Sequence, residues 1–246
     1  MIRSEYHNHG LVLTIDRAEQ RNALSVEMYG QLQAGLQQAH DNPDCHSVII
    51  RGSGGVFTAG NDLKDFQQPR QGGDSAGLSF LRTLISIDVP VIAAVEGYAI
   101  GIGATLLQHC DFVYADDSAF FSLPFVSMGL CPEGGSSQIL ERIAGRRKAS
   151  EWLLLGERFT AREAAEAGLL TALSEPGQTM ADARATAAKL AEKPVQALRL
   201  TKRMLREPGR AELMAVLDSE RELFRERLNS EEAQQVFRNF FERSKK

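Results

Sequence analysis

The chain has 246 residues, of which 43% are hydrophobic, and its 28 basic and 32 acidic residues give a formal net charge of -4. This composition is typical of a globular protein with a sizeable core, and the scattered basic residues argue against nucleic-acid binding. Three cysteines at irregular spacing (Cys45, Cys110 and Cys131) predict reduced thiols and no bound metal.

The first half of the chain alternates between strands, glycine turns and helices. Segments rich in β-branched and apolar residues predict strands at 10–15, 47–51, 89–95 and 111–115. Apolar residues at helical spacing predict helices at 25–40, with Ser25 as N-cap, at 75–87, and from the turn at 97–103 to His109. Residues 56–64 are expected to run from a strand through a glycine turn into a helix, and 67–74 to form a mobile surface loop.

Residues 89–107 are apolar and long enough to raise the question of a membrane span. Pro90, Glu96 and three glycines interrupt the segment, so we interpret it as a buried strand, a loop and a helix start. The first residues lack the apolar segment of a secretory signal, and the last ones differ from a peroxisomal Ser-Lys-Leu signal. We therefore expect a cytoplasmic protein without membrane contact.

The second half of the chain is predominantly helical. Helices are expected at 138–143, 146–155, 161–167, 179–191, 194–206, 211–228 and 231–243. Pro208-Gly209 is expected to end the helix that starts at Pro194. Phe237, Phe240 and Phe241 form an apolar face on the last helix, which either packs on the protein's own core or serves as a lid or subunit contact.

Two glycine turns each leave a main-chain N–H at the start of a helix. In Thr58-Ala-Gly-Asn-Asp62, Gly60 permits a sharp turn and leaves the N–H of Asn61 free. In Gly101-Ile-Gly103 the same arrangement leaves the N–H of Ile102 free. Two such amides that converge on one carbonyl oxygen form an oxyanion hole, although phosphate binding or tight packing explains either turn equally well alone.

Residues 119–137 are apolar nearly throughout and present one carboxylate, Glu133, between Pro132 and Gly134. A carboxylate in such surroundings is poorly hydrated, which raises its pKa and suits it to take up and return a proton near neutral pH. The alternative interpretation is a solvated acid near a helix N-terminus, where acids are favoured in any case.

Four segments together resemble the crotonase (enoyl-CoA hydratase/isomerase) family in their residues and in their order along the chain. They are residues 16–24 with Arg21-Asn-Ala-Leu24, Phe57-Thr-Ala-Gly-Asn-Asp-Leu63, Gly97-Tyr-Ala-Ile-Gly-Ile-Gly103, and residues 124–137. The resemblance implies an α/β fold with a crotonase-type ββα spiral core that binds acyl-CoA (residues 1–192). It further implies a helical C-terminal part (residues 193–246) that serves as lid and oligomerisation surface in a homotrimer or hexamer.

The resemblance also implies a set of site residues. A coenzyme A thioester would lie between the two glycine turns, with its oxygen bound by the N–H groups of Asn61 and Ile102. Coenzyme A belongs to the substrate, so no separate cofactor is expected. The implied substrate-binding residues are Arg21 near phosphate, Ala23, Thr58, Ala59, Gly60 and Asp62 on the adenine and pantetheine side, Gly101 in the second turn, and Phe125 and Leu130 in an apolar wall.

Within this family the sequence resembles the isomerases more than the hydratases. Hydratases carry two catalytic glutamates, at positions that correspond to Thr105 and Phe125 here. Pro132-Glu-Gly-Gly-Ser-Ser137 and Ala59-Gly-Asn-Asp-Leu63 instead resemble the peroxisomal-type Δ3,Δ2-enoyl-CoA isomerases, in which the corresponding glutamate is the acid/base. The implied reaction, as in fatty acid β-oxidation, moves a double bond from C3 to C2 of an acyl-CoA, with Glu133 carrying the proton from C2 to C4.

Two alternatives stay open at this point. The first is an enoyl-CoA hydratase or another crotonase reaction, with Asp62 or Glu96 as the remaining acids near the turns. The second is a non-catalytic acyl-CoA-binding module, because some family members with the Pro-Glu-Gly segment are domains of chromatin proteins. Turnover of 3-enoyl or 2-enoyl thioesters would separate all three hypotheses.

Overall fold

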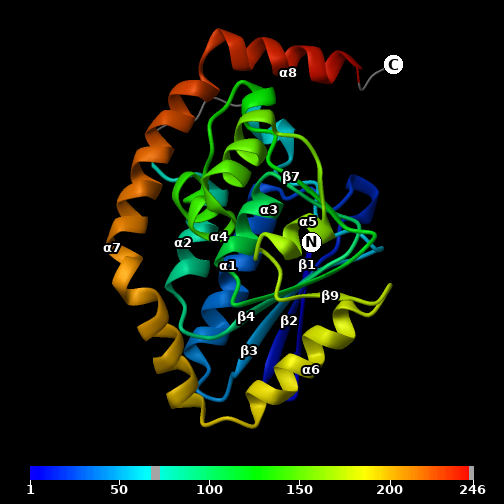
Figure 1. Ribbon diagram of the computed structural model, residues 1–246, viewed down its shortest axis with the longest axis vertical. Coiled ribbons are helices and arrows are strands. Elements are labelled where there is room, and N and C mark those ends of the chain that lie inside the picture. Colours follow the sequence, from blue (N-terminus) through cyan, green and yellow to red (C-terminus); the bar gives the residue numbers. More distant parts are fainter. Residues whose placement is uncertain (68–72, 244–246) are drawn as a thin grey trace.

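The computed structural model describes residues 1–67 and 73–243 of the chain. Within these residues, six strands form one sheet in the order β1-β2-β3-β4-β6-β9 (Figure 1). The strands are β1 (Ile2–His7), β2 (Gly10–Ile15), β3 (Ser47–Gly52), β4 (Val91–Val95), β6 (Phe112–Asp116) and β9 (Ala172–Ser174). Only the β1–β2 pair is antiparallel among these strands, and the sheet with its covering helices confirms the predicted α/β class.

The central strands form where the sequence is apolar on both faces. Every residue of β2 and of β4 is buried, as expected for strands covered on two sides. Alternate residues point to opposite layers. One set lies in the main core with helix α1 (Val26–Asp41): Leu11, Leu13, Val48 and Ile50. The other set faces helix α6 (Thr179–Ala191): Val12, Ile49 and Ile92. Strand β1 was missed by the sequence analysis, because five of its six side chains are exposed and show no apolar alternation.

A smaller sheet holds the glycine turns. Its three strands are β5 (Tyr98–Ile100), β7 (Phe120–Ser122) and β8 (Phe159–Thr160). The strand expected from residue 56 is wrong: this part of the described chain forms isolated bridges, from Thr58 to Ala99 and from Asn61 to Leu24. Glycines in the left-handed region at positions 54, 55 and 60 interrupt any regular extended ladder here.

Helices cover both faces of the sheet: α1 (Val26–Asp41), α2 (Ala76–Ser86), α3 (Ile102–Thr105), α4 (Ser136–Ser150), α5 (Ala161–Glu166) and α6 (Thr179–Ala191). As predicted, Ser25 caps α1, with its hydroxyl accepting a hydrogen bond from the N–H of Met28. The predicted break between residues 143 and 146 is confirmed by Gly145, which is non-helical (φ 74°) within α4. Helix α6 packs on the face of the sheet opposite to α1.

One long helix, α7 (Val195–Leu228, 34 residues), contradicts the prediction that Pro208-Gly209 ends a helix. The proline lacks the N–H that would bond to the carbonyl of Met204, but both residues are exposed, so water can hydrate that carbonyl. Ion pairs before and after Pro208 also stabilise the helix, since Arg206 pairs with Asp111 and Glu212 with Arg142. Helix α7 therefore runs along one side of the whole molecule (Figure 1).

The last helix, α8 (Glu231–Arg243), follows α7 at one end of the molecule (Figure 1). Phe237 is buried in the main core and Phe241 packs against it, so the apolar face predicted for this helix packs largely on the protein's own core. Phe240 is 46% exposed and lines a cavity described below. The boundary suggested after residue 192 falls between α6 and α7.

Other expectations from the sequence concern single segments. Residues 89–107, the most membrane-like run, form β4, β5 and α3, and no helix in the described part of the chain has the length and apolar character of a bilayer span. The three cysteines are free thiols, as expected. The mobile loop predicted at 67–74 lies mostly at residues 68–72, outside the described residues.

Candidate active site

The two glycine turns lie in direct contact with each other. Gly60 has a φ of +87°, and a Cβ added there would lie 2.5 Å from the carbonyl oxygen of Ile100. A Cβ added at Gly103 would lie 2.5 Å from the Thr58 side chain. Glycine is therefore required at both positions, because any side chain would push the two turns apart.

The amides of Asn61 and Ile102 are available to a ligand. The N–H of Leu24 donates to the Gly60 carbonyl and the N–H of Asp62 to the Leu24 carbonyl, so the N–H of Asn61 between them points the other way. Ile102 is the first residue of α3, where main-chain N–H groups lack helical partners. Within residues 1–67 and 73–243, neither N–H donates to a protein acceptor.

These residues line one cavity of about 220 Å³, which we call the amide cavity. Seven of the residues predicted for the site line it: Ala59, Gly60, Asn61, Gly101, Ile102, Phe125 and Leu130. Leu63, Pro124 and Met128 add further apolar surface, and the C-terminal helices contribute Phe224 and Phe240. The cavity thus combines two main-chain donors with apolar walls, an arrangement suited to a thioester oxygen with an apolar neighbour.

Tyr29, which the sequence analysis did not single out, holds the Asn61 side chain. Its hydroxyl donates to Oδ1 of Asn61 at 2.6 Å, and the Tyr29 side chain is buried in α1. Gly77 of α2 packs against the same place, since a Cβ there would lie 2.9 Å from the Ile102 side chain. Helices α1 and α2 therefore fix the geometry of both amide-bearing residues.

Four predicted binding residues lie around the first turn and line neither cavity described here: Arg21, Ala23, Thr58 and Asp62. Arg17 links two of them, donating to the Ala23 carbonyl at 3.1 Å and to the Asp62 carboxylate at 2.8 Å. Burial raises the pKa of Asp62, but the hydrogen bonds from Arg17 and from the N–H of Lys64 outweigh it, so the net pKa is lowered.

Thr58 is fully buried, and both hydrogen bonds of its hydroxyl are internal. The hydroxyl donates to the Asn22 carbonyl at 2.7 Å and accepts from the Gly60 N–H at 3.0 Å. Asn22 is equally buried and donates to the carbonyls of Ser53 and Val56. The Thr58 side chain therefore stabilises the turn from inside, and Asn22, missed by the sequence analysis, does the same.

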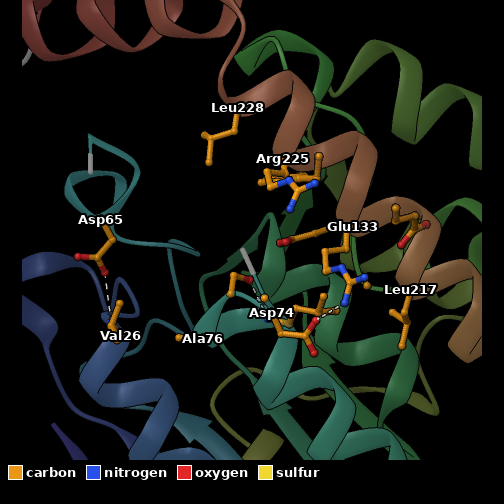
Figure 2. Close-up of a pocket in the computed structure, with 15 residues that line it drawn as sticks. Val26, Asp65, Asp74, Ala76, Glu133, Leu217, Arg225 and Leu228 are labelled. Atoms are coloured by element: carbon orange, nitrogen blue, oxygen red, sulfur yellow. Dashed lines mark hydrogen bonds and ion pairs between the residues drawn. The ribbon is translucent and has the colours of Figure 1, made fainter. Parts of the chain in front are cut away.

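Glu133 lines a second cavity of about 290 Å³, which we call the acid cavity (Figure 2). Glu133 is 9% exposed as a residue and its side chain points into this cavity, so the interpretation of Glu133 as a solvated acid is wrong. The apolar lining consists of Val26, Ala76, Leu78, Leu217, Phe224 and Leu228. Because Phe224 lines both cavities, the acid cavity and the amide cavity adjoin each other rather than forming one space.

The turn that carries Glu133 is tied to the second glycine turn by side chains after α3. Gly134 and Gly135 both adopt positive φ values, 68° and 81°. The Gly134 carbonyl accepts hydrogen bonds from Gln108 at 3.0 Å and from Nε2 of His109 at 2.7 Å. A carbonyl only accepts, so Nε2 of His109 carries the proton, and burial lowers the pKa of this histidine to about 4.

Glu220 of α7 binds the other side of the same turn. It is 6% exposed and accepts hydrogen bonds from the N–H of Gly135 (2.6 Å), the N–H of Ser137 (3.1 Å) and the hydroxyl of Ser137 (2.6 Å). Burial raises the pKa of Glu220 although these bonds act against it. The only signal in the sequence was an acid within the apolar stripe of Leu217, Phe224 and Leu228 on one helix face.

The positions that correspond to the hydratase glutamates hold no acid. Thr105 is buried beneath the Glu133 turn, and a Cβ added at Gly134 would lie 2.5 Å from its side chain. Phe125 lines the amide cavity. The spare acid considered from the sequence, Glu96, accepts a hydrogen bond from Thr179 of α6 and lines neither cavity.

Proteins similar to this chain act on coenzyme A thioesters according to their names. A family model described as enoyl-CoA hydratase/isomerase matches residues 6–246. Enoyl-CoA delta isomerase 2 of Homo sapiens is 33% identical over 242 residues, which cover 95% of this chain and 61% of that protein. The 2,3-dehydroadipyl-CoA hydratase of Escherichia coli is 35% identical over 219 residues, which cover 87% of this chain and 85% of that protein.

The solved structures agree in fold as well. The enoyl-CoA hydratase/isomerase from Pseudoalteromonas atlantica superposes with a TM-score of 0.94 at 36% identity and covers 98% of this chain and 97% of that chain. The predicted crotonase fold is thereby confirmed, including its helical C-terminal part. Matched along almost its whole length, this chain belongs to the enoyl-CoA hydratase/isomerase family, the crotonase family of enzymes.

Proposed function

We propose that this protein is a Δ3,Δ2-enoyl-CoA isomerase in which Glu133 is the acid/base. The observation that carries the proposal is that Glu133 is buried and lines a cavity that shares Phe224 with the cavity of the two available amides. Threonine and phenylalanine at positions 105 and 125 support it, since a pair of catalytic carboxylates that activates water is missing there.

The proposed reaction begins with the thioester oxygen in the amide cavity. The N–H groups of Asn61 and Ile102 donate to this oxygen, and Glu133 takes a proton from C2 of the 3-enoyl chain. The C2–H electrons form a new C1–C2 double bond and the C1–O π electrons move onto oxygen. The resulting dienolate keeps its C3–C4 double bond and carries its charge largely on the thioester oxygen. Each preorganised donor of this kind lowers such a barrier by about 2.7–4 kcal/mol.

Glu133 then returns the same proton to C4, where the C3–C4 π electrons form the new C–H bond. The C1–C2 π electrons become the C2–C3 double bond and the oxygen restores the carbonyl, which leaves a 2-enoyl thioester. No atom is gained or lost, so one carboxylate is sufficient. The apolar lining of the amide cavity keeps water from the dienolate, which would otherwise exchange the proton with solvent. The acyl chain would pass Phe224, the residue that the two cavities share.

The test is the variant Glu133→Gln, which keeps the shape of the side chain and removes the base. Isomerisation of a 3-enoyl-CoA, followed by the absorbance of the conjugated thioester, should fall by about 10²-fold or more. Glu96→Gln is the matched control, because Glu96 follows strand β4 beside the glycine turn but contacts Thr179 instead of either cavity. A Glu133→Gln enzyme that isomerises near the parent rate would refute the proposal.

Hydration is the second candidate function, because the Escherichia coli relative is named a hydratase and Glu220 lines the acid cavity with Glu133. A pair of carboxylates near one substrate can activate water. Loss of absorbance of a 2-enoyl-CoA in water measures this reaction directly. We expect it to be weak, since both oxygens of Glu220 already accept hydrogen bonds from the Glu133 turn. Tight acyl-CoA binding with neither reaction would favour the non-catalytic module.

We further propose that the protein assembles as a homotrimer or hexamer. Leu200, Met204 and Leu205 on helix α7 are 52%, 66% and 80% exposed, and apolar side chains gathered on one helix are typical of a subunit contact. Light scattering on the purified protein distinguishes monomer, trimer and hexamer. A monomer at micromolar concentration would contradict this proposal without affecting the reaction.

A further inference from the structure

Glu220 is the most buried acid of the acid cavity, and hydrogen bonds rather than a cation hold it. Among the described residues, Asp74 pairs with Arg82 and Arg221, while Arg225 pairs with Glu222. In the same part of the chain Glu220 has no ion pair, and its three partners all belong to the turn that follows Glu133. A buried carboxylate with three donors on one short turn stabilises that turn strongly.

We propose that Glu220 is a positioning residue for Glu133: from helix α7 it binds the N-terminal amides of α4 and thereby sets where the Glu133 carboxyl points. The proposal rests on the proposed role of Glu133 as the acid/base. Glu220 itself does not exchange a proton with substrate, because both of its oxygens face the turn.

The turn needs such an external support because its own backbone is permissive. Gly134 and Gly135 are consecutive glycines with positive φ, so the unsupported segment has many accessible conformations. The Gly134 carbonyl is held on one side by His109, and the Gly135 N–H on the other by Glu220. Removing Glu220 leaves the buried Gly135 N–H without its partner, whereas the Gly134 carbonyl also accepts a hydrogen bond from Gln108.

Glu220 also accepts the hydrogen bonds of the free N–H groups at the N-terminus of helix α4, where the helix dipole is positive. The N–H groups of Gly135 and Ser137 lie within four residues of Glu133, and such amides stabilise an anion and weaken it as a base. Because Glu220 occupies them, they are not donors for the Glu133 carboxyl. The helix terminus is thus satisfied by an acid that does not react.

The experiment compares Glu220→Gln and Glu220→Ala with Glu212→Gln in the full-length enzyme. A glutamine keeps the shape but offers one acceptor oxygen instead of two, and alanine removes all three hydrogen bonds. Glu212 is the matched control, since it lies on the same helix and also accepts from α4 (Gln138 and Arg142), but at an exposed site away from the turn.

Two measurements are made on each variant. The first is kcat and KM for a 3-enoyl-CoA: we expect kcat to fall about tenfold for Glu220→Gln and about a hundredfold for Glu220→Ala, with KM within about twofold. The second is amide hydrogen exchange at Gly135 and Ser137, which should accelerate in both Glu220 variants. Glu212→Gln should change neither quantity.

The outcomes separate the possible roles of Glu220. Values of kcat and exchange equal to those of Glu212→Gln would overturn the proposal. It would equally be overturned if Glu220→Gln removed hydration of a 2-enoyl-CoA and left isomerisation intact, because Glu220 would then be a reacting group. Hydrogen exchange needs no substrate, so it tests the support of the turn even if Glu133→Gln shows that isomerisation is not the reaction. Glu220→Gln keeps the test decisive if the alanine variant does not fold.

Discussion

The amide cavity and the acid cavity are built in opposite ways. The two amides belong to turns that touch each other directly, with Gly60 against Ile100 and Gly103 against Thr58. The acid lies on a turn whose supports come from elsewhere: His109 follows α3, and Glu220 lies on α7, more than eighty residues along the chain. The meeting of the two amides is a property of local backbone geometry, although Phe224 and Phe240 of the C-terminal helices complete the wall of their cavity. The acid turn itself is held by a residue of the C-terminal helix α7.

Because of this difference, the glycine turns and the turn that carries Glu133 should tolerate different substitutions. The amides need no particular side chain, only glycines that let two backbones approach, so their function depends on a few tenths of an ångström. The role proposed for the Glu133 carboxyl needs its turn held from two sides, by the hydrogen bonds that His109 and Glu220 make to that turn. Substitutions that act on one half and spare the other can test this contrast.

The largest effect is expected where the two turns touch. Gly60→Ala places a methyl group 2.5 Å from the Ile100 carbonyl oxygen, so the amides of Asn61 and Ile102 can no longer converge, and kcat should fall by about 10²–10³. Gly55→Ala is the control, since Gly55 also has a positive φ (71°) but nothing within 4 Å of an added Cβ. Equal losses in both variants would mean that backbone strain alone is responsible.

The next effect is a pH dependence of stability at His109, which supports the turn that carries Glu133. The pKa of His109 is lowered by burial to about 4, so between about pH 6.5 and 4 the unfolded chain binds a proton that the folded one does not. The free energy of unfolding should therefore decrease as the pH falls through this range, on the order of 3 kcal/mol.

Urea unfolding of the parent and of His109→Gln at several pH values measures this contribution. The glutamine keeps an N–H donor for the Gly134 carbonyl and does not titrate, so the difference between the two proteins isolates the histidine. A difference that stays constant from pH 6.5 to 4 would contradict the assignment of a neutral, buried ring.

A smaller effect is expected at Tyr29. Tyr29→Phe removes the hydroxyl that donates to Asn61 at 2.6 Å and leaves the ring in place, so kcat/KM should fall about fivefold with little change in stability. Tyr114→Phe is the control, because its hydroxyl also makes a 2.6 Å hydrogen bond, to Thr186 far from both cavities. If the control variant lost as much activity, the Tyr29 hydroxyl would have no specific role.

The smallest effect should come from Pro208, in the helix that carries Glu220. Pro208→Ala supplies an N–H for the Met204 carbonyl, while the unfolded chain gains freedom, so the free energy of unfolding should rise by only about 0.5–1 kcal/mol. Thermal unfolding measures this change. A fall in stability or in kcat would show that the proline shapes α7 for its contact with the acid turn.

Much of the fold follows from patterns that lie close together in the sequence. Alternating and β-branched residues predicted β2, a continuous apolar run predicted β4, and Ser25 predicted the start of α1, because burial and capping depend on neighbouring residues. Exposed strand β1 and the uninterrupted α7 could not be predicted in this way. The pairing of β1 depends on its neighbour β2, and the continuity of α7 through Pro208 depends on contacts with distant residues.

In the candidate site, too, residues marked by their neighbours in the sequence were predicted, and residues that act through distant partners were not. The glycine positions predicted that the amides of Asn61 and Ile102 are free, the family resemblance implied that they act as a pair, and the structure brings both residues to one cavity. Glu133 was singled out by its apolar surroundings, but Tyr29 and Glu220 were not, because each acts through a partner that is remote in the sequence. A lone acid in an apolar helix stripe is the kind of signal that would have identified Glu220.

Helix α7 imposes an order on biosynthesis. A ribosome releases residues from the N-terminus onward, so both glycine turns and the sheet emerge before residue 220 is made. Until then the amides of Gly135 and Ser137 can bond only to water or to transient partners. A nascent chain can thus bring its two glycine turns together first, whereas the acid turn and the last wall of the amide cavity are completed only when the late helices dock.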